Sequence, residues 1–144
     1  MNDPVLEAYE SAHYFIEDSE ISLRFEIGKL CPELDLWLEK NGFNTAVFIT
    51  AHNPHSQILT PLDNCQRQSK LVRELLSQGY CYLKGYSTDA EHIWPEEESL
   101  LVPNMDLSHA LCLARKYQQK AVVWIEYQAE PELRVAVVET INNQ

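Results

Sequence analysis

AVFITAHNPHSQILTPLD, residues 46–63, places an apolar strand, a polar loop and the start of a helix in direct succession. The first part, residues 46–50, is apolar at almost every position, which is typical of a central strand covered on both faces. The last part, TPLD at residues 60–63, has the form of a capping box with proline in the first helical turn. This stretch therefore predicts a buried strand that ends in a polar loop and is followed by a capped helix.

Outward from this stretch, the chain alternates between strand-like and helix-like patterns. Residues 21–27 are apolar at every second position, as in a half-buried strand. Leu71, Val72, Leu75 and Leu76 form the predicted buried stripe of the helix that begins at Pro61. Strands are predicted at residues 13–16, 21–27, 46–50, 80–86, 99–102, 121–127 and 133–138. Two further helices are predicted from Pro32 to Gly42 and from Asp106 or Ser108 onward, and residues 1–11 are interpreted as a frayed end or a first helical turn.

The resulting order, ββαβαββαββ, predicts one α/β (mixed α+β) domain over residues 1–144. We expect a single mixed sheet of five to seven strands, packed by three main helices. The order of the strands within the sheet does not follow from this pattern.

The charge of the chain restricts its partners. Eleven basic residues face 22 acidic ones, which gives a formal net charge of −11. This average field repels nucleic acid and anionic membranes. The compact basic stripe of Arg67, Lys70 and Arg73 is interpreted either as a solvated helix flank or as a site for a phosphate or an acidic partner. A nucleic-acid binder is the least favoured class.

Motifs for common cofactors are absent from the sequence. It contains no P-loop, no GxGxxG nicotinamide motif, no HExxH and no nucleophile elbow, so the cofactor remains unknown. The four cysteines, Cys31, Cys65, Cys81 and Cys112, form no closely spaced pair, so neither zinc nor any other metal site is expected. The first residues do not form an export signal, and no apolar run reaches the length of a membrane helix. We therefore expect a cytoplasmic protein with reduced cysteines.

The candidate site lies between Thr50 and Asn64. A helix N-terminus offers unpaired N–H groups, and strand ends in α/β sheets often border ligand sites. His52 is a candidate general acid or base, because its pKa normally lies near neutrality. In the alternative interpretation, Asn53 with the proline after it forms a turn and Asn64 only caps the loop.

A second candidate is the acidic run at residues 96–98. Neighbouring residues on a strand point to opposite faces, so at most two of the three carboxylates share a face. Glu97 then points to the opposite face from the other two, and paired carboxylates could share a proton or bind a divalent metal. Glu97 and Glu98 are retained as weak catalytic candidates. The alternative is a solvated charge run at the entrance to a strand.

Several motifs together resemble a bacterial domain-of-unknown-function family, DUF3293, over about residues 12–127. They are FITAHNP at residues 48–54, Asn64, Gly79, Gly85, WPEEES at residues 94–99 and the helical segment at residues 110–119. The resemblance implies a bacterial cytoplasmic protein of one domain and brings no established activity. His52 stands where an aromatic residue is expected in this family, which argues against a histidine performing the family's chemistry.

The polar residues of these motifs define the predicted ligand-binding set. They are Thr50, Asn53, Asn64, Glu97, Glu98 and Ser99. If they converge, they form a cleft suited to a polar small molecule, such as a nucleoside or a metabolite with amine groups. The favoured interpretation is therefore a small-molecule-binding domain, with an enzymatic role left open. The alternative is a non-catalytic protein-interaction or regulatory module, and a protein partner or homo-oligomer is compatible with either.

Overall fold

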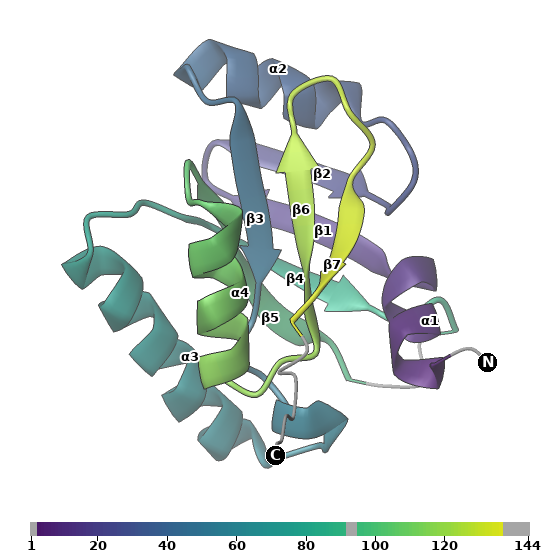
Figure 1. Ribbon diagram of the computed structural model, residues 1–144, viewed down its shortest axis with the longest axis vertical. Coiled ribbons are helices and arrows are strands. Elements are labelled where there is room, and N and C mark those ends of the chain that lie inside the picture. The colour runs from purple at the N-terminus through teal and green to yellow at the C-terminus, as the bar shows by residue number, and fades with distance from the viewer. Residues whose placement is uncertain (1–2, 92–94, 137–144) are drawn as a thin grey trace, which may run out of the picture.

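The computed structural model describes residues 3–91 and 95–136 (Figure 1). Within these residues the chain forms a seven-stranded sheet, four α-helices and one short 3-10 helix. The strands are β1 (His13–Asp18), β2 (Ile21–Phe25), β3 (Thr45–Ile49), β4 (Leu83–Thr88), β5 (Glu97–Pro103), β6 (Ala121–Glu126) and β7 (Glu132–Val135). The helices are α1 (Pro4–Ser11), α2 (Pro32–Asn41), α3 (Pro61–Ser77) and α4 (Leu107–Lys116), and the 3-10 helix is η1 (Pro54–Ser56).

The sheet has the strand order β2-β1-β4-β5-β3-β6-β7. The predicted α/β class and element order are confirmed, but all six pairings between the described strands are antiparallel, not mixed. The reason lies in the crossovers. Helix α3 joins β3 to β4, which run parallel to each other with the antiparallel β5 between them. Helix α4 joins β5 to β6 in the same way, with β3 between them.

Strand β3 is covered on both faces, as its apolar sequence predicts. Val47 and Ile49 belong to the core under α3 and α4, which lie together on one side of the sheet (Figure 1). Ala46 and Phe48 belong to a second core, to which α2 contributes Leu34 and Leu38. The helices thus pack on opposite faces of the sheet.

The second core is rich in aromatic rings. Phe48 makes edge contacts with Tyr14 and Phe25, at ring-centroid distances of 5.5 and 5.3 Å. These contacts bring β1 and β2 toward β3, and in Figure 1 the two strands cross behind it because the sheet is strongly twisted. A Cβ at Gly85 would lie 2.3 Å from Phe15 O and 2.9 Å from the Phe48 ring, so only glycine fits beneath this ring.

The helix ends follow the sequence signals. Thr60 Oγ1 accepts a hydrogen bond from the Asp63 N–H at 3.1 Å and caps α3. Gly42 ends α2 with a left-handed φ of 77°. The prediction that Leu76 is inward is wrong: it is 55% exposed, because α3 buries only the stripe of Leu71 and Leu75 together with polar residues nearer its start.

Two elements differ most from what the sequence predicts. Residues 4–11 form a complete helix, α1, which Asp3 caps by accepting from the Val5 N–H at 2.9 Å. Strand β4 begins at Leu83, three residues later than predicted, because the Tyr80 N–H donates to Leu75 O and closes the end of α3. The predicted contributions of Trp94 and of residues 137–138 lie outside the described residues. None of the described helices has the length and apolar character needed to cross a membrane.

Candidate binding site at one end of the central strands

The antiparallel pairing of the central strands determines where the site lies. Because β5 runs opposite to β3 and β4, the start of β5 lies at the same edge of the sheet as the ends of β3 and β4. Thr50, just beyond β3, donates its hydroxyl to Glu98 O at 2.6 Å. The loop after β3 is thereby attached to the beginning of β5, and the predicted neighbourhood of Thr50 and the acidic run is confirmed.

Asn53 lies at the centre of the polar cluster and is buried. Its backbone N–H donates to Asn64 Oδ1 at 2.8 Å, and its Oδ1 accepts from Asn64 Nδ2 at 2.7 Å and from the Leu59 N–H at 3.0 Å. Its Nδ2 donates to Glu97 Oε2 at 2.8 Å. A single side chain therefore joins the loop, the first turn of α3 and the first residue of β5.

Two further side chains of α3 hold the loop from behind. Gln68 Oε1 accepts from the Ala51 N–H at 2.9 Å. Arg67 Nε donates to Ala51 O at 2.7 Å, and its Nη2 donates to Tyr117 O and, at 3.1 Å, to Gln118 Oε1. Arg67 is therefore committed to backbone and side-chain acceptors inside the protein, which separates it from the basic stripe that the sequence suggested.

The loop itself has an unusual backbone. Asn53, His55 and Ser56 adopt φ values of 50°, 55° and 60°, in the left-handed region that residues other than glycine seldom occupy. Hydrogen bonds from the His55 N–H to Gln118 O, at 2.9 Å, and from Gln119 Nε2 to His52 O, at 2.8 Å, hold this conformation. Strained residues that the surroundings hold in place are often found at functional sites.

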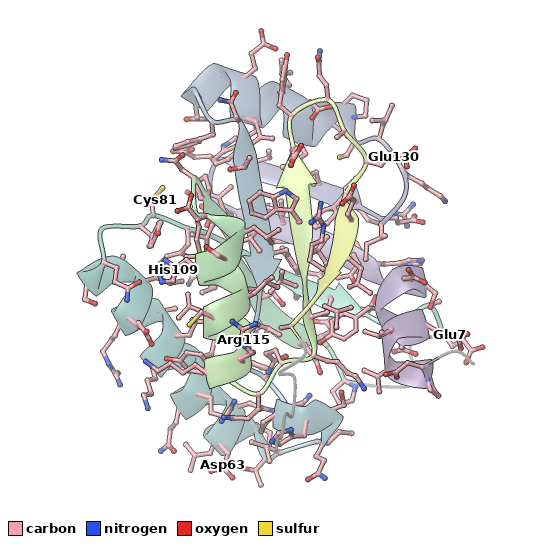
Figure 2. All side chains as sticks on the ribbon, in the orientation of Figure 1. Glu7, Asp63, Cys81, His109, Arg115 and Glu130 are labelled. Atoms are coloured by element: carbon pink, nitrogen blue, oxygen red, sulfur yellow. The ribbon has the colours of Figure 1, made fainter. Side chains whose placement is uncertain are left out.

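A cavity of about 390 Å³ adjoins the cluster. Helix α1 forms one wall, and the loop after β3, the end of β4 and the start of β5 form the others. The lining residues are Pro4, Val5, Ala8, Tyr9, Ala12, Tyr14, Asn53, Ser56, Ile58, Ser87, Thr88, Asp89, Pro95, Glu97 and Gln119. In Figure 2, Glu7 points away from the body of the protein, so the opposite side of α1 faces the cavity.

Only part of the predicted ligand-binding set reaches this cavity. Asn53 and Glu97 line it, whereas the remaining four do not. Asn64 holds Asn53 from the side of α3, and Thr50 holds the backbone of β5. Glu98 is exposed and Ser99 is buried within β5, where its hydroxyl donates to Glu97 O at 3.2 Å. That the set binds a ligand stays a prediction; of its members, Asn64 and Glu97 contact Asn53 directly.

Glu97 is the half-buried carboxylate of the cavity wall. Burial raises its pKa, and the hydrogen bond from Asn53 partly offsets this rise. Burial, together with the nearby charge of Glu97, raises the pKa of Tyr9 to about 12. Tyr9 is therefore a neutral phenol, and it lies near a carboxyl group that holds its proton to a higher pH than a free glutamate does.

Thr88, at the end of β4, is 6% exposed and lines the same cavity. Its hydroxyl has no hydrogen-bond partner among the described residues. An unpaired buried hydroxyl costs free energy, so such a group requires an explanation.

His52 does not line the cavity. Its ring is half-buried, and its Nε2 is buried without a hydrogen-bond partner in the part of the chain that the structure describes. Burial lowers the pKa of His52, and the charge of Glu98 opposes this shift. A general acid or base must reach its substrate, so His52 and the exposed Glu98 are not placed for that role at this cavity.

Several lining residues were not predicted from the sequence. Tyr9, Tyr14, Thr88 and Gln119 come from α1, β1, β4 and the turn before β6. No local motif marks Tyr9, Tyr14 or Thr88, because these residues come together only through the order of the strands in the sheet. Gln119 alone had a signal, since it closes the helical segment of the family resemblance.

The described residues contain no group of three or more His, Cys, Asp or Glu side chains arranged to hold a metal ion. The four cysteines are free thiols, and Cys81 lies at the surface in Figure 2.

Comparison with known proteins adds one finding. A family model matches residues 49–122, which include the loop after β3, Asn64, Glu97 and Gln119. The chain belongs to the family described as Protein of unknown function (DUF3293). Neither a curated protein nor a solved structure matches the chain. Within this DUF3293 protein, α1 lies outside the matched segment although it forms a wall of the cavity.

Proposed function

We propose that this protein binds a small polar molecule in the cavity between α1 and the ends of the central strands. The observation that carries the proposal is the pairing, on one cavity wall, of the half-buried Glu97 carboxylate with the unpartnered Thr88 hydroxyl. The Thr88 hydroxyl is buried without a partner, and the Glu97 carboxylate has only Asn53 as a donor among the described residues, so burial of both groups costs free energy. A ligand that bonds to them would offset this cost.

The composition of the cavity supports this proposal. Its volume of about 390 Å³ falls within the range of small-molecule sites. Such sites combine apolar walls with a few placed polar groups. Here Val5, Ala8 and Ile58 supply apolar surface, while Glu97 and Thr88 supply the polar groups.

The rigidity of the Asn53 cluster also supports a binding role. Four hydrogen bonds join Asn53 to Asn64, Leu59 and Glu97, and the last of these holds the Glu97 carboxylate from one side. Binding sites gain affinity when their polar groups are held in place before the ligand arrives. The strained loop backbone is compatible with the same role.

We also propose that the protein acts in the bacterial cytoplasm. The exposed thiols of Cys65, Cys81 and Cys112 suit a reducing compartment, and the family resemblance implies a bacterial source. No reaction is assigned to the cavity, although Glu97 and Tyr9 are groups of its wall that could exchange a proton.

A metabolite screen by thermal shift tests the proposal, with one variant that fills the cavity. Ala8→Trp places an indole on the cavity side of α1, whereas Glu7→Trp places the same ring on its outward side and serves as the matched control. Compounds that stabilise the wild type should stabilise Glu7→Trp equally and lose their effect on Ala8→Trp. Compounds that stabilise all three proteins alike would place binding elsewhere, and a screen without any hit would favour the non-catalytic interaction module.

A further inference from the structure

We infer that the ligand of this cavity is an organic cation, an amine or amidine on an apolar body, whose N–H groups donate to Glu97. This inference rests on the proposed function and names the chemical class of its ligand.

The charge of the cavity wall favours a cation. Among the described lining residues there is no lysine, arginine or histidine, whereas Glu97 presents a carboxylate to the cavity. The formal net charge of the whole chain, −11, is negative like the cavity wall. An anionic ligand such as a phosphate or carboxylate would meet like charge without a compensating partner, which is costly in a partly buried site.

Three side chains of the wall, Glu97, Gln119 and Thr88, offer acceptors to a ligand. In the described residues only Asn53 donates to the Glu97 carboxylate, and it uses Oε2, so Oε1 is left for a ligand. Gln119 uses its Nε2 for His52 O and Tyr117 O, so its amide oxygen is its remaining polar atom. The Thr88 hydroxyl can accept as well as donate. A ligand rich in N–H donors matches these groups.

The apolar part of the cavity wall indicates what the uncharged part of the ligand is. Aliphatic side chains from α1 and the loop, together with Tyr9 and Tyr14, provide a largely apolar surface; the aliphatic members are Val5, Ala8, Ala12 and Ile58. A compact hydrocarbon or aromatic body would gain from burial there. A small, fully hydrated ion such as ammonium would not use this surface.

Three probes of nearly identical shape separate charge from size: benzamidine is cationic, benzamide is neutral and benzoate is anionic. Each is titrated into the wild-type protein to millimolar concentration while backbone amides are followed by ¹H–¹⁵N NMR. Benzamidine should shift the amides of Asn53, Thr88, Glu97 and Gln119, benzamide should do so more weakly, and benzoate should leave them unchanged.

A charge-matched pair of variants then tests the role of Glu97. Glu97→Gln should weaken benzamidine binding about tenfold and leave benzamide binding nearly unchanged, since it removes one charge-assisted hydrogen bond. Glu96→Gln makes the same substitution at the neighbouring, exposed position outside the cavity wall and should bind benzamidine as the wild type does. The comparison of the three probes uses only the wild-type protein, so it tests the inference even if Glu97→Gln does not fold.

Two results would overturn the inference. If benzoate or benzamide shifts the cavity amides as strongly as benzamidine, the cationic class is wrong although small-molecule binding stands. If none of the probes reaches the cavity while the metabolite screen yields hits that Ala8→Trp removes, the class is again wrong and the proposed function survives. If no probe shifts the cavity amides and the metabolite screen yields no hit, the proposed function itself is wrong.

Discussion

Asn53 and Asn64 are joined by two hydrogen bonds, one from the Asn53 backbone N–H to Asn64 Oδ1 and one from Asn64 Nδ2 to Asn53 Oδ1. Both residues are buried, so neither bond is easily replaced by water. This pair attaches the loop after β3 to the first turn of α3, and it holds Asn53 where its side-chain Nδ2 donates to Glu97.

Asn64→Ala should lower the free energy of unfolding by about 1–3 kcal/mol, because it leaves the buried Asn53 N–H without an acceptor. Urea denaturation measures this loss. In a double-mutant cycle, Asn53→Ala and Asn64→Ala should together cost clearly less than the two single losses added, since they share the same bonds. Additive losses would show that the pair does not act as a unit.

Glu97→Gln should stabilise the unliganded protein at neutral pH by about 1 kcal/mol, as removal of an unfavourable functional group often does. The pKa of Glu97 is raised in the folded state by burial, so the folded protein holds this proton more readily than the unfolded chain. The cost of the charged carboxylate is therefore full above the folded pKa and vanishes below the unfolded pKa, near about 4.3. The advantage of Glu97→Gln should shrink as the pH falls through this window, and urea titrations across the window measure it. A constant advantage would contradict the burial of Glu97.

Thr88→Val should raise the free energy of unfolding by about 1 kcal/mol, because it replaces an unpartnered buried hydroxyl with a methyl group of similar size. The same substitution should weaken binding of any ligand that the cavity accepts. Denaturant titration and thermal-shift titration measure the two effects. A loss of stability would mean that an ordered water satisfies the hydroxyl.

His52→Phe should make the protein less sensitive to mild acid. Burial lowers the pKa of His52, so the unfolded chain takes up this proton before the folded protein does, and the wild type loses stability as the pH falls below about 6.5. Phenylalanine removes this proton uptake and also the unpartnered Nε2. Between about pH 7 and pH 5, the wild type should therefore lose more of its free energy of unfolding than the variant does in urea titrations. Parallel pH profiles would contradict the lowered pKa.

Phe48→Ala should cost about 3–5 kcal/mol, because it opens a cavity in the aromatic core between β3 and the first hairpin. Leu62→Ala on the exposed face of α3 is the control and should change stability by no more than about 0.5 kcal/mol. Urea denaturation of both variants tests the expectation. Similar losses for both would mean that Phe48 does not serve as a core residue.

The sequence predicted the elements well where a local pattern decides them. The alternation after Ile21, the capping residues around Pro61 and the apolar run ending at Ile49 each identify one element without reference to the rest of the chain. It failed at Tyr80, where aromatic residues imitate a strand although the backbone still closes α3. It also could not show that β5 inserts between β3 and β4, because strand order depends on contacts between distant residues.

The candidate site likewise has a part that the sequence predicts and a part that it does not. The contact of Asn53 with Asn64 follows from a short loop that leaves a strand and enters a helix, and Glu97 follows if β5 adjoins β3. Tyr9 and Thr88 were beyond prediction, because each reaches the cavity through an element whose neighbours the sequence does not specify. The Asn53–Asn64 part of the site is thus formed by residues close in sequence, whereas Tyr9 and Thr88 join it only when the sheet has formed.

The position of β3 in the sheet has a consequence for biosynthesis. Both of its partners, β5 and β6, lie later in the chain, so β3 leaves the ribosome with neither edge paired, whereas β1 and β2 can close their hairpin at once. At a synthesis rate of roughly 5–20 residues per second, residues 50–96 take several seconds to appear before β5 can begin to pair. During that interval the most apolar segment of the nascent chain is exposed, which makes it the natural target for a holding chaperone.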